Sequence, residues 1–99
     1  MNYTQNEKIA QVTDSTIVVG VDIGSQIHYA RAFDNRGREL TKRVFSFHND
    51  LEGFNSFNLW AETPKIENNK TAVLIGCEPT GHYWFAFAKY VNQNLHSLL

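Results

Sequence analysis

Two short apolar runs, residues 17–23 and 71–77, constrain the fold of this chain more than any other feature of its sequence. Each run is short, aliphatic and partly β-branched, which predicts a buried strand. The first run contains a carboxylate, Asp22, and the second is followed at once by Glu78. A carboxylate that is buried without a partner costs several kcal/mol or has a raised pKa. The position of both acids therefore has to be explained.

Patterned segments between the two runs predict further strands and a helix. Residues 28–34 and 43–48 alternate in polarity, and the sequence DNRG between them is typical of a turn in which glycine adopts a positive φ. These segments and the first run therefore predict an antiparallel meander. A helix follows, capped by Asn49 or Asp50 and ended by Pro64 together with the polar sequence KIENNK. Its predicted buried stripe comprises Leu51, Phe54, Phe57 and Ala61.

The segment after the second run predicts another helix. Thr80 can cap it, and apolar residues recur there at helical spacing. Its predicted buried stripe comprises Trp84, Phe87, Ala88, Val91 and Leu95. The element order is then three strands, a helix, a strand and a helix, which is an α/β fold.

The length and composition exclude several classes of protein. A chain of 99 residues is one small domain, with residues 1–15 a polar leader and 16–99 the folded part. The net charge of -1 provides no overall positive field for nucleic acid. The single cysteine, Cys77, excludes an internal disulfide and a multi-thiolate zinc site. No apolar run could span a membrane and the start is unlike a signal peptide, so we expect a soluble cytoplasmic protein.

Asp22 and Glu78 stand at or near the carboxyl ends of the two strands that we expect to be central. If these strands are parallel neighbours, both acids project from one edge of the sheet and repel each other unless a cation lies between them. Mg²⁺ takes carboxylate oxygens, waters and substrate phosphates as ligands. The sequence therefore predicts that the two acids bind Mg²⁺ or Mn²⁺. Alternatively, backbone N–H groups satisfy Asp22, and Glu78 complements the dipole of the following helix.

The sequences GVDIGSQIHYARAFDNRG and GCEPTGHYW, in this order of elements, resemble the N-terminal RuvC-like domain of the DEDD insertion-sequence transposases of the IS110 family, which includes the Piv-type DNA invertases. The resemblance implies a ribonuclease H-like mixed sheet, incomplete at its C-terminal side. It also implies that Asp22 and Glu78 are two of four acids for Mg²⁺-dependent DNA cleavage and strand transfer. The other two acids, and a C-terminal domain with a serine implicated in strand exchange, lie further along in that family. We therefore expect these 99 residues to hold half of a metal site and not to be catalytic alone.

The same resemblance implies DNA as a partner, a guide RNA in some members, self-association into a homo-oligomer, and no membrane. Four basic residues around the predicted hairpin are candidates for phosphate contacts, although such a cluster also fits a solvated turn. They are Arg36, Arg38, Lys42 and Arg43. Thr80 and His82 are further candidates, because backbone N–H groups at a helix start can hold a phosphate oxygen and a histidine there can lie near the scissile phosphate.

Two other interpretations remain open. The sequence VDIGSQIHYARAFDNRGREL also resembles the first phosphate-binding hairpin of actin-like sugar kinases and ATPases. There, Gly24 and Ser25 would approach phosphates and Asp22 would meet Mg²⁺ through water. The acid that follows the second run so closely favours the nuclease fold instead. In the third interpretation, the chain is a non-catalytic module whose open sheet edge pairs with a neighbour.

Overall fold

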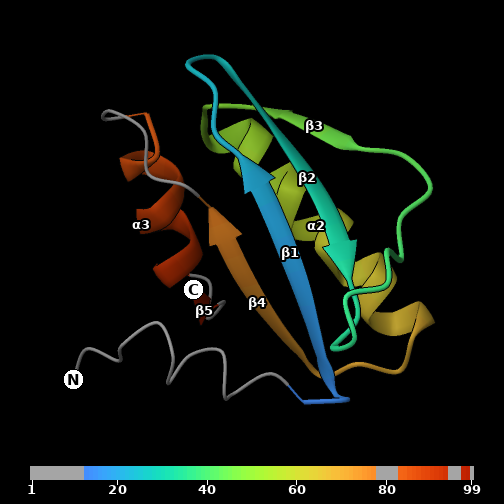
Figure 1. Ribbon diagram of the computed structural model, residues 1–99. Helices are drawn as coiled ribbons and strands as arrows, with labels where there is room; N and C mark the ends of the chain where they lie inside the picture. The colour runs from blue at the N-terminus through green and yellow to red at the C-terminus, as the bar shows by residue number, and fades with distance from the viewer. Residues whose placement is uncertain (1–12, 78–82, 94–96, 99) are drawn as a thin grey trace.

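A five-stranded mixed sheet forms the centre of the protein (Figure 1). The computed structural model describes residues 13–77, 83–93 and 97–98. The strands are β1 (Thr16–Asp22), β2 (Ile27–Phe33), β3 (Phe45–His48), β4 (Ala72–Cys77) and β5 (Ser97–Leu98), in the spatial order β3-β2-β1-β4-β5. The first three are antiparallel neighbours, whereas β4 runs parallel to β1 and β5 parallel to β4. The predicted meander, the parallel second run and the ribonuclease H-like α/β fold are confirmed.

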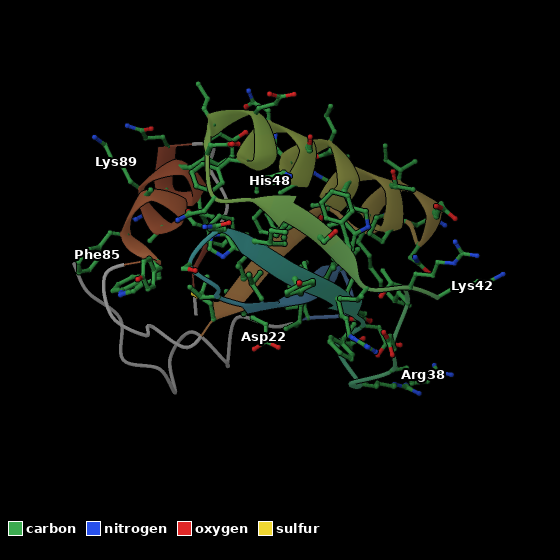
Figure 2. All side chains as sticks on the ribbon, turned by 90° about the horizontal axis from the view of Figure 1, so that it is seen from above. Asp22, Arg38, Lys42, His48, Phe85 and Lys89 are labelled. Atoms are coloured by element: carbon green, nitrogen blue, oxygen red, sulfur yellow. The ribbon has the colours of Figure 1, made fainter. Side chains whose placement is uncertain are left out.

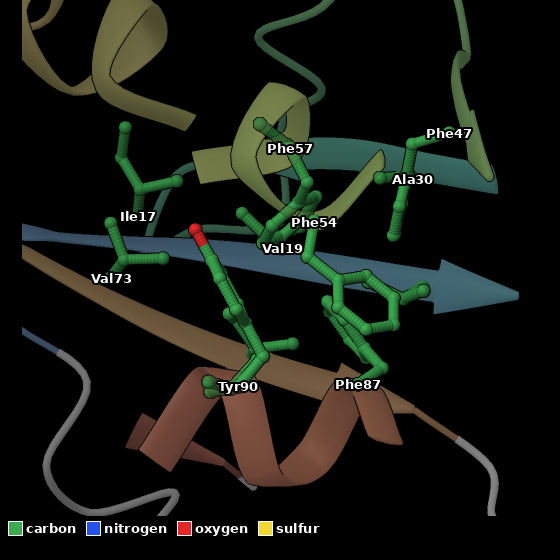
Figure 3. Close-up of a cluster of buried hydrophobic side chains, with 13 residues drawn as sticks. Ile17, Val19, Ala30, Phe47, Phe54, Phe57, Val73, Phe87 and Tyr90 are labelled. Carbon is green, nitrogen blue, oxygen red and sulfur yellow. The ribbon is translucent and has the colours of Figure 1, made fainter. Parts of the chain in front are cut away.

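Two helices, α2 (Leu51–Glu67) and α3 (Phe85–Gln93), pack on the same face of this sheet (Figures 2 and 3). The Asp50 carboxylate accepts a hydrogen bond from the Gly53 N–H at 2.7 Å, which confirms Asp50 as the N-cap of α2. As expected, the helix ends within the polar sequence KIENNK, at Glu67, although Pro64 alone does not stop it. Pro64 lies in the last turn, where the missing N–H removes a single helical bond. Asn68 closes the helix instead, with its backbone N–H and side-chain amide both donating to the Pro64 carbonyl.

The core lies between the sheet and the two helices, where aromatic rings contact one another (Figure 3). Phe57 is fully buried, with its ring 4.8 Å from Phe47 and 5.1 Å from Phe87. The predicted stripe on α2 is confirmed except for Leu51, which is exposed because it lies on the opposite side of the helix. On α3 the buried residues are Phe87, Ala88, Tyr90 and Val91. Trp84 precedes that helix, while Thr80 and Leu95 lie outside the described residues.

The opposite face of the sheet carries no helix within the described part of the chain (Figure 2). Along β1 the side chains of Ile17, Val19 and Val21 are buried under the helices. Since side chains alternate along a strand, Asp22 belongs to the other face, and its side chain is exposed. The expectation that Asp22 is a buried carboxylate is therefore wrong. Among the described residues, no helix is long and apolar enough to cross a membrane.

Candidate functional site

Asp22 ends β1 at the carboxyl edge of the sheet and points away from the helices (Figure 2). Its antiparallel partner is Tyr29, at the beginning of β2. No cation of the described residues forms an ion pair with Asp22. On the other side of β1, Val21 pairs with Cys77 in the parallel register. Cys77, the chain neighbour of Glu78, therefore lies at this edge. Glu78 lies outside the described residues.

A buried histidine, His28, and a partly buried asparagine, Asn49, fix the turn that follows Asp22. The Gly24 N–H donates to Nδ1 of His28 at 3.1 Å, so the proton of the neutral ring is on Nε2, 2.9 Å from Oδ1 of Asn49. The Asn49 backbone N–H donates to the Gln26 carbonyl at 2.8 Å. His28 is fully buried between the rings of the core. The turn beside Asp22 is thus attached to the junction between β3 and α2, a role for His28 and Asn49 that our sequence analysis missed.

Gly24 is required in this turn because the backbone comes back very close to it. A Cβ at this position would lie 2.3 Å from the carbonyl oxygen of Ile27, a distance that no side chain tolerates. This agrees with a turn role for Gly24. This tight backbone path keeps Asp22 and Tyr29 side by side at the edge.

The described residues near this edge fit a divalent cation only in part. Asp22 offers the carboxylate oxygens that Mg²⁺ prefers, but no three His, Cys, Asp or Glu side chains among the described residues converge on one point. Asp22 could be one ligand of a metal whose remaining ligands are waters, phosphate and further acids. The neighbouring Cys77 is half-buried, and burial raises the pKa of its thiol, which does not favour a thiolate nucleophile.

The basic residues of the hairpin between β2 and β3 differ in whether their charge is already paired within the chain. Arg38 is largely committed to Asp34, with Nε 3.3 Å from Oδ2. The Asp34 carboxylate also accepts the backbone N–H groups of Arg36 and Arg38, both at 2.9 Å. The pKa of Asp34 is lowered, chiefly by the Arg38 N–H and less by the Arg36 N–H and the Arg38 charge. Gly37 has the positive φ, +82°, that the turn prediction requires.

Lys42 and Arg43 lie beside a hollow of about 480 Å³ between the β2–β3 connection and the last turns of α2. Both side chains are exposed, and within the described part of the chain neither takes part in an ion pair. Trp60 also lines this hollow, with one face of its ring stacked on Phe45 at 5.0 Å. Two cations beside an aromatic surface can contact phosphates and bases, although the carboxylate of Glu67 lines the same hollow.

The basic residues and Asp22 occupy opposite ends of β2. Asp22 pairs with Tyr29, whereas the turn containing Arg36 and Arg38 follows Phe33, four residues or about 13 Å further along the strand. Figure 2 shows Arg38 and Lys42 well to one side of Asp22. The structure therefore brings Lys42, Arg43 and Trp60 together but separates them from the acid. Thr80 and His82 lie outside the described residues.

Comparison with known proteins gives one informative match. No curated protein matches this sequence. A solved structure, the ethanolamine utilization protein EutJ from Carboxydothermus hydrogenoformans, has a TM-score of 0.42 and 15% identity over 83% of this chain and 35% of its own length. This chain thus spans about a third of that protein, and the two are too distant for a comparison of function. A family model described as a transposase, the DEDD transposases of the IS110 type, matches residues 19–99. The chain therefore belongs to the IS110 family of DEDD transposases.

Proposed function

We propose that this chain contributes Asp22 and Glu78, the first two metal-binding acids, to a transposase that cleaves and transfers DNA strands. The observation that supports it is the exposed carboxylate of Asp22 beside the end of β4, within a chain of the transposase family. Cys77 packs against the core on the helix side of β4. Cys77, the residue before Glu78, pairs with Val21, the residue before Asp22.

Mg²⁺ or Mn²⁺ suits this pair of acids, and Asp22 and Glu78 would hold it. When bound, such an ion polarises a phosphoryl oxygen and stabilises the charge that develops on it. The chain's own residues keep the first ligand in place. His28 and Asn49 hold the turn after Asp22, while pairing with Tyr29 fixes the end of β1. By resemblance, the two remaining acids of the site come from a later segment of the family's proteins.

DNA is the proposed substrate, and its phosphates are the proposed partners of the basic residues. Lys42 and Arg43 are the best candidates, because Arg38 is already paired with Asp34. Arg36, Thr80 and His82 remain further candidates, the last two near the cleaved phosphate. Contacts of this kind make affinity fall steeply with salt. The Trp60 surface would accept a base of single-stranded nucleic acid, so a guide RNA is a second proposed partner, by family resemblance.

Paramagnetic broadening by Mn²⁺ in NMR spectra tests the acid pair. We expect Mn²⁺ to broaden first the amide signals of residues 21–24 and 76–78, and Asp22→Asn or Glu78→Gln to remove this effect without changing the unfolding midpoint. The matched control is Glu52→Gln, which removes an exposed acid in the first turn of α2 and should leave the broadening unchanged. Broadening that persists in both acid variants contradicts the proposal. Specific ATP binding at Gly24 and Ser25 would favour the kinase-like interpretation instead.

DNA affinity tests the basic residues separately from the metal. Arg43→Glu together with Lys42→Glu should weaken binding of a labelled oligonucleotide and reduce its salt dependence, while Mn²⁺ broadening stays intact. Lys89→Glu, an equally exposed cation on α3, is the control. If Lys89→Glu weakens DNA binding as much as the double variant does, the interaction is not centred on the hollow beside Trp60. Comparison of DNA with RNA of the same sequence distinguishes the two proposed partners.

A further inference from the structure

The hollow beside Trp60 is lined by side chains of both charges. Lys42 and Arg43 come from the β2–β3 connection, and Glu67 comes from the end of α2. All three side chains are exposed, and in the described part of the chain Glu67, like the two cations, takes part in no ion pair. A carboxylate weakens a site for phosphate alone, because like charges repel. The hollow therefore suits a ligand that carries hydrogen-bond donors as well as a negative group.

Glu67 stands where a carboxylate is unfavourable for the helix itself. It is the last residue of α2, where the terminal carbonyl groups give the helix a partial negative charge. A negative side chain at this end costs stability, whereas Glu52 in the first turn adds to it. The basic residue of the last turn, Lys65, lies 3.3 Å from Glu62 and pairs with it. A ligand therefore explains the position of Glu67 better than the stability of the helix does.

On the side of α2, the wall of the hollow is one face of the helix. Trp60, Pro64 and Glu67 line it at spacings of four and three residues, so they lie above one another on adjacent turns. Side chains on a helix lean toward its N-terminus, and we expect the Glu67 carboxylate above Pro64, on the side of Trp60. The Trp60 ring is fixed by Phe45, which is parallel to it at 5.0 Å, and by Phe57 at 5.8 Å. A flat ligand can thus lie against Trp60 and Pro64 with its edge at Glu67.

Among the nucleobases, guanine matches this arrangement. Its Watson–Crick edge carries two adjacent donors, N1–H and the N2 amino group, which fit the two oxygens of one carboxylate. Adenine and cytosine each offer one amino group beside an acceptor nitrogen, and that nitrogen would face the second carboxylate oxygen. Every base can stack on an aromatic ring, so the edge and not the ring provides the selection. The hollow, at about 480 Å³, has room for one nucleotide.

We propose that the hollow binds one unpaired guanine of a nucleic acid, whose N1–H and N2–H groups donate to Glu67. The base lies against Trp60, and the adjoining phosphate contacts Lys42 and Arg43. In a duplex the same edge of guanine pairs with cytosine, so the contact selects a guanine that is single-stranded or turned out of the helix. This inference rests on the proposed nucleic-acid partner and adds a base preference to it. It does not depend on the metal site.

Fluorescence titration with matched oligonucleotides tests the base preference. An oligothymidine with one central guanosine is compared with the same strand containing inosine, which lacks only the N2 amino group. The Trp84→Phe chain is the reference protein, because Trp60 is then the only tryptophan in the sequence. The guanine strand should quench Trp60 and bind roughly 10-fold more tightly than the inosine strand, since one hydrogen bond to a charged group is lost. The same pair in oligouridine shows whether DNA or RNA supplies the guanine.

Glu67→Gln separates the base contact from the fold. In this variant the two strands should bind with nearly equal affinity, because an amide offers one acceptor where the carboxylate offers two. The unfolding midpoint should rise slightly, since the substitution removes a negative charge from the C-terminal end of α2. The matched control is Glu52→Gln at the other end of the helix, which should lower the midpoint slightly and keep the preference for guanine.

The possible outcomes distinguish this inference from the proposed function. If binding falls with salt and in the Lys42→Glu, Arg43→Glu double variant but is equal for guanine and inosine, the guanine site is wrong and the proposed phosphate contacts stand. A preference for guanine that persists in Glu67→Gln also overturns the inference, because another group then reads the base. If neither strand binds or quenches Trp60, the phosphate contacts proposed for this hollow fail together with the guanine site.

Discussion

The two faces of the sheet differ in what their side chains can do. On the covered face, Ile17 and Val19 are completely buried and pack against rings from both helices. On the open face, Asp22 is exposed and its neighbour Tyr29 is 45% exposed. β1 alone carries side chains of both kinds, since the buried Val21 directly precedes the exposed Asp22. At the carboxyl edge, the packed side chains therefore lie on the side of the helices and the exposed ones on the other side, although Leu74, further back on that other face, is also buried.

This division makes the two faces separable by mutation. A change on the covered face should alter the free energy of unfolding before it alters any binding. A change on the open face should alter binding and leave the fold intact. The difference can be measured at the centre of the core, at the buried His28 that holds the turn after Asp22, and at the exposed hairpin that contains Asp34.

The largest effect is expected from Phe57→Ala. Phe57 is fully buried and contacts Phe47, Phe87 and Trp60, so its loss leaves a cavity at the meeting point of β3, α2 and α3. Substitutions of this kind cost about 3–5 kcal/mol, a large part of the stability of a domain of this size. Urea denaturation followed by circular dichroism measures the loss.

The matched control for that loss is Tyr29→Ala on the open face. Because Tyr29 is nearly half exposed, its removal should cost about 1 kcal/mol or less. An equal loss in the two variants would show that the open face also contributes a packed core, and the contrast between the faces would fail. Phe57→Leu should recover part of the stability and confirm that the cavity is the cause.

An intermediate effect is expected from His28→Phe, which keeps an aromatic ring but removes both ring nitrogens. The Gly24 N–H and Asn49 Oδ1 would then lose their buried partner. A buried polar group without a partner costs about 1–3 kcal/mol. Urea denaturation should show this loss, and hydrogen exchange should show faster exchange of the Gly24 amide.

The control for His28 is His48→Phe, in the neighbouring β3, where the side chain is exposed and the change should stay within about 0.5 kcal/mol. Comparison of the two variants therefore shows how much of the stability loss comes from the buried hydrogen bonds of His28 and how much from replacing any imidazole by a phenyl ring. If His28→Phe leaves the Gly24 amide as protected as before, His28 does not hold the turn beside Asp22.

Most of the fold could be predicted from the sequence because the apolar patterns were strong. The two β-branched runs, the alternation in residues 28–34 and the Asp50 cap all led to the observed elements. The burial of Asp22 was predicted wrongly because residues 17–23 are apolar on both faces, so their sequence shows no alternation. Leu51 was misplaced because an apolar residue beside a helix start fits either side of the helix. Pro64 does not stop the helix by itself, because its missing N–H removes one helical bond, and the helix ends three residues later within KIENNK.

The candidate site was only partly predictable. A strand-end acid such as Asp22 is visible in the sequence. The separation of the basic residues from it also follows from the meander, because the end of β1 and the turn after β2 lie at opposite ends of the sheet. By contrast, the contact of His28 with Asn49 joins residues 21 positions apart, and nothing in the spacing of one histidine and one asparagine indicates it.

The smallest effect is expected at Asp34, in the exposed hairpin, where protonation should loosen the turn without unfolding the core. The pKa of Asp34 is lowered in the folded chain, first by the Arg38 N–H, so the ionised carboxylate stabilises the turn. A lowered pKa means that this contribution is complete above the unfolded pKa of about 4 and is lost as pH falls through the folded value. The Arg36 and Arg38 amides should therefore exchange faster, and shift in NMR spectra, only at acidic pH. In Asp34→Asn these amides should lack that transition, while Asp14→Asn should retain it. If the Arg36 and Arg38 amides still show the transition in Asp34→Asn, another titrating group causes it. The turn would then respond to a charge elsewhere in the chain and not to Asp34 alone.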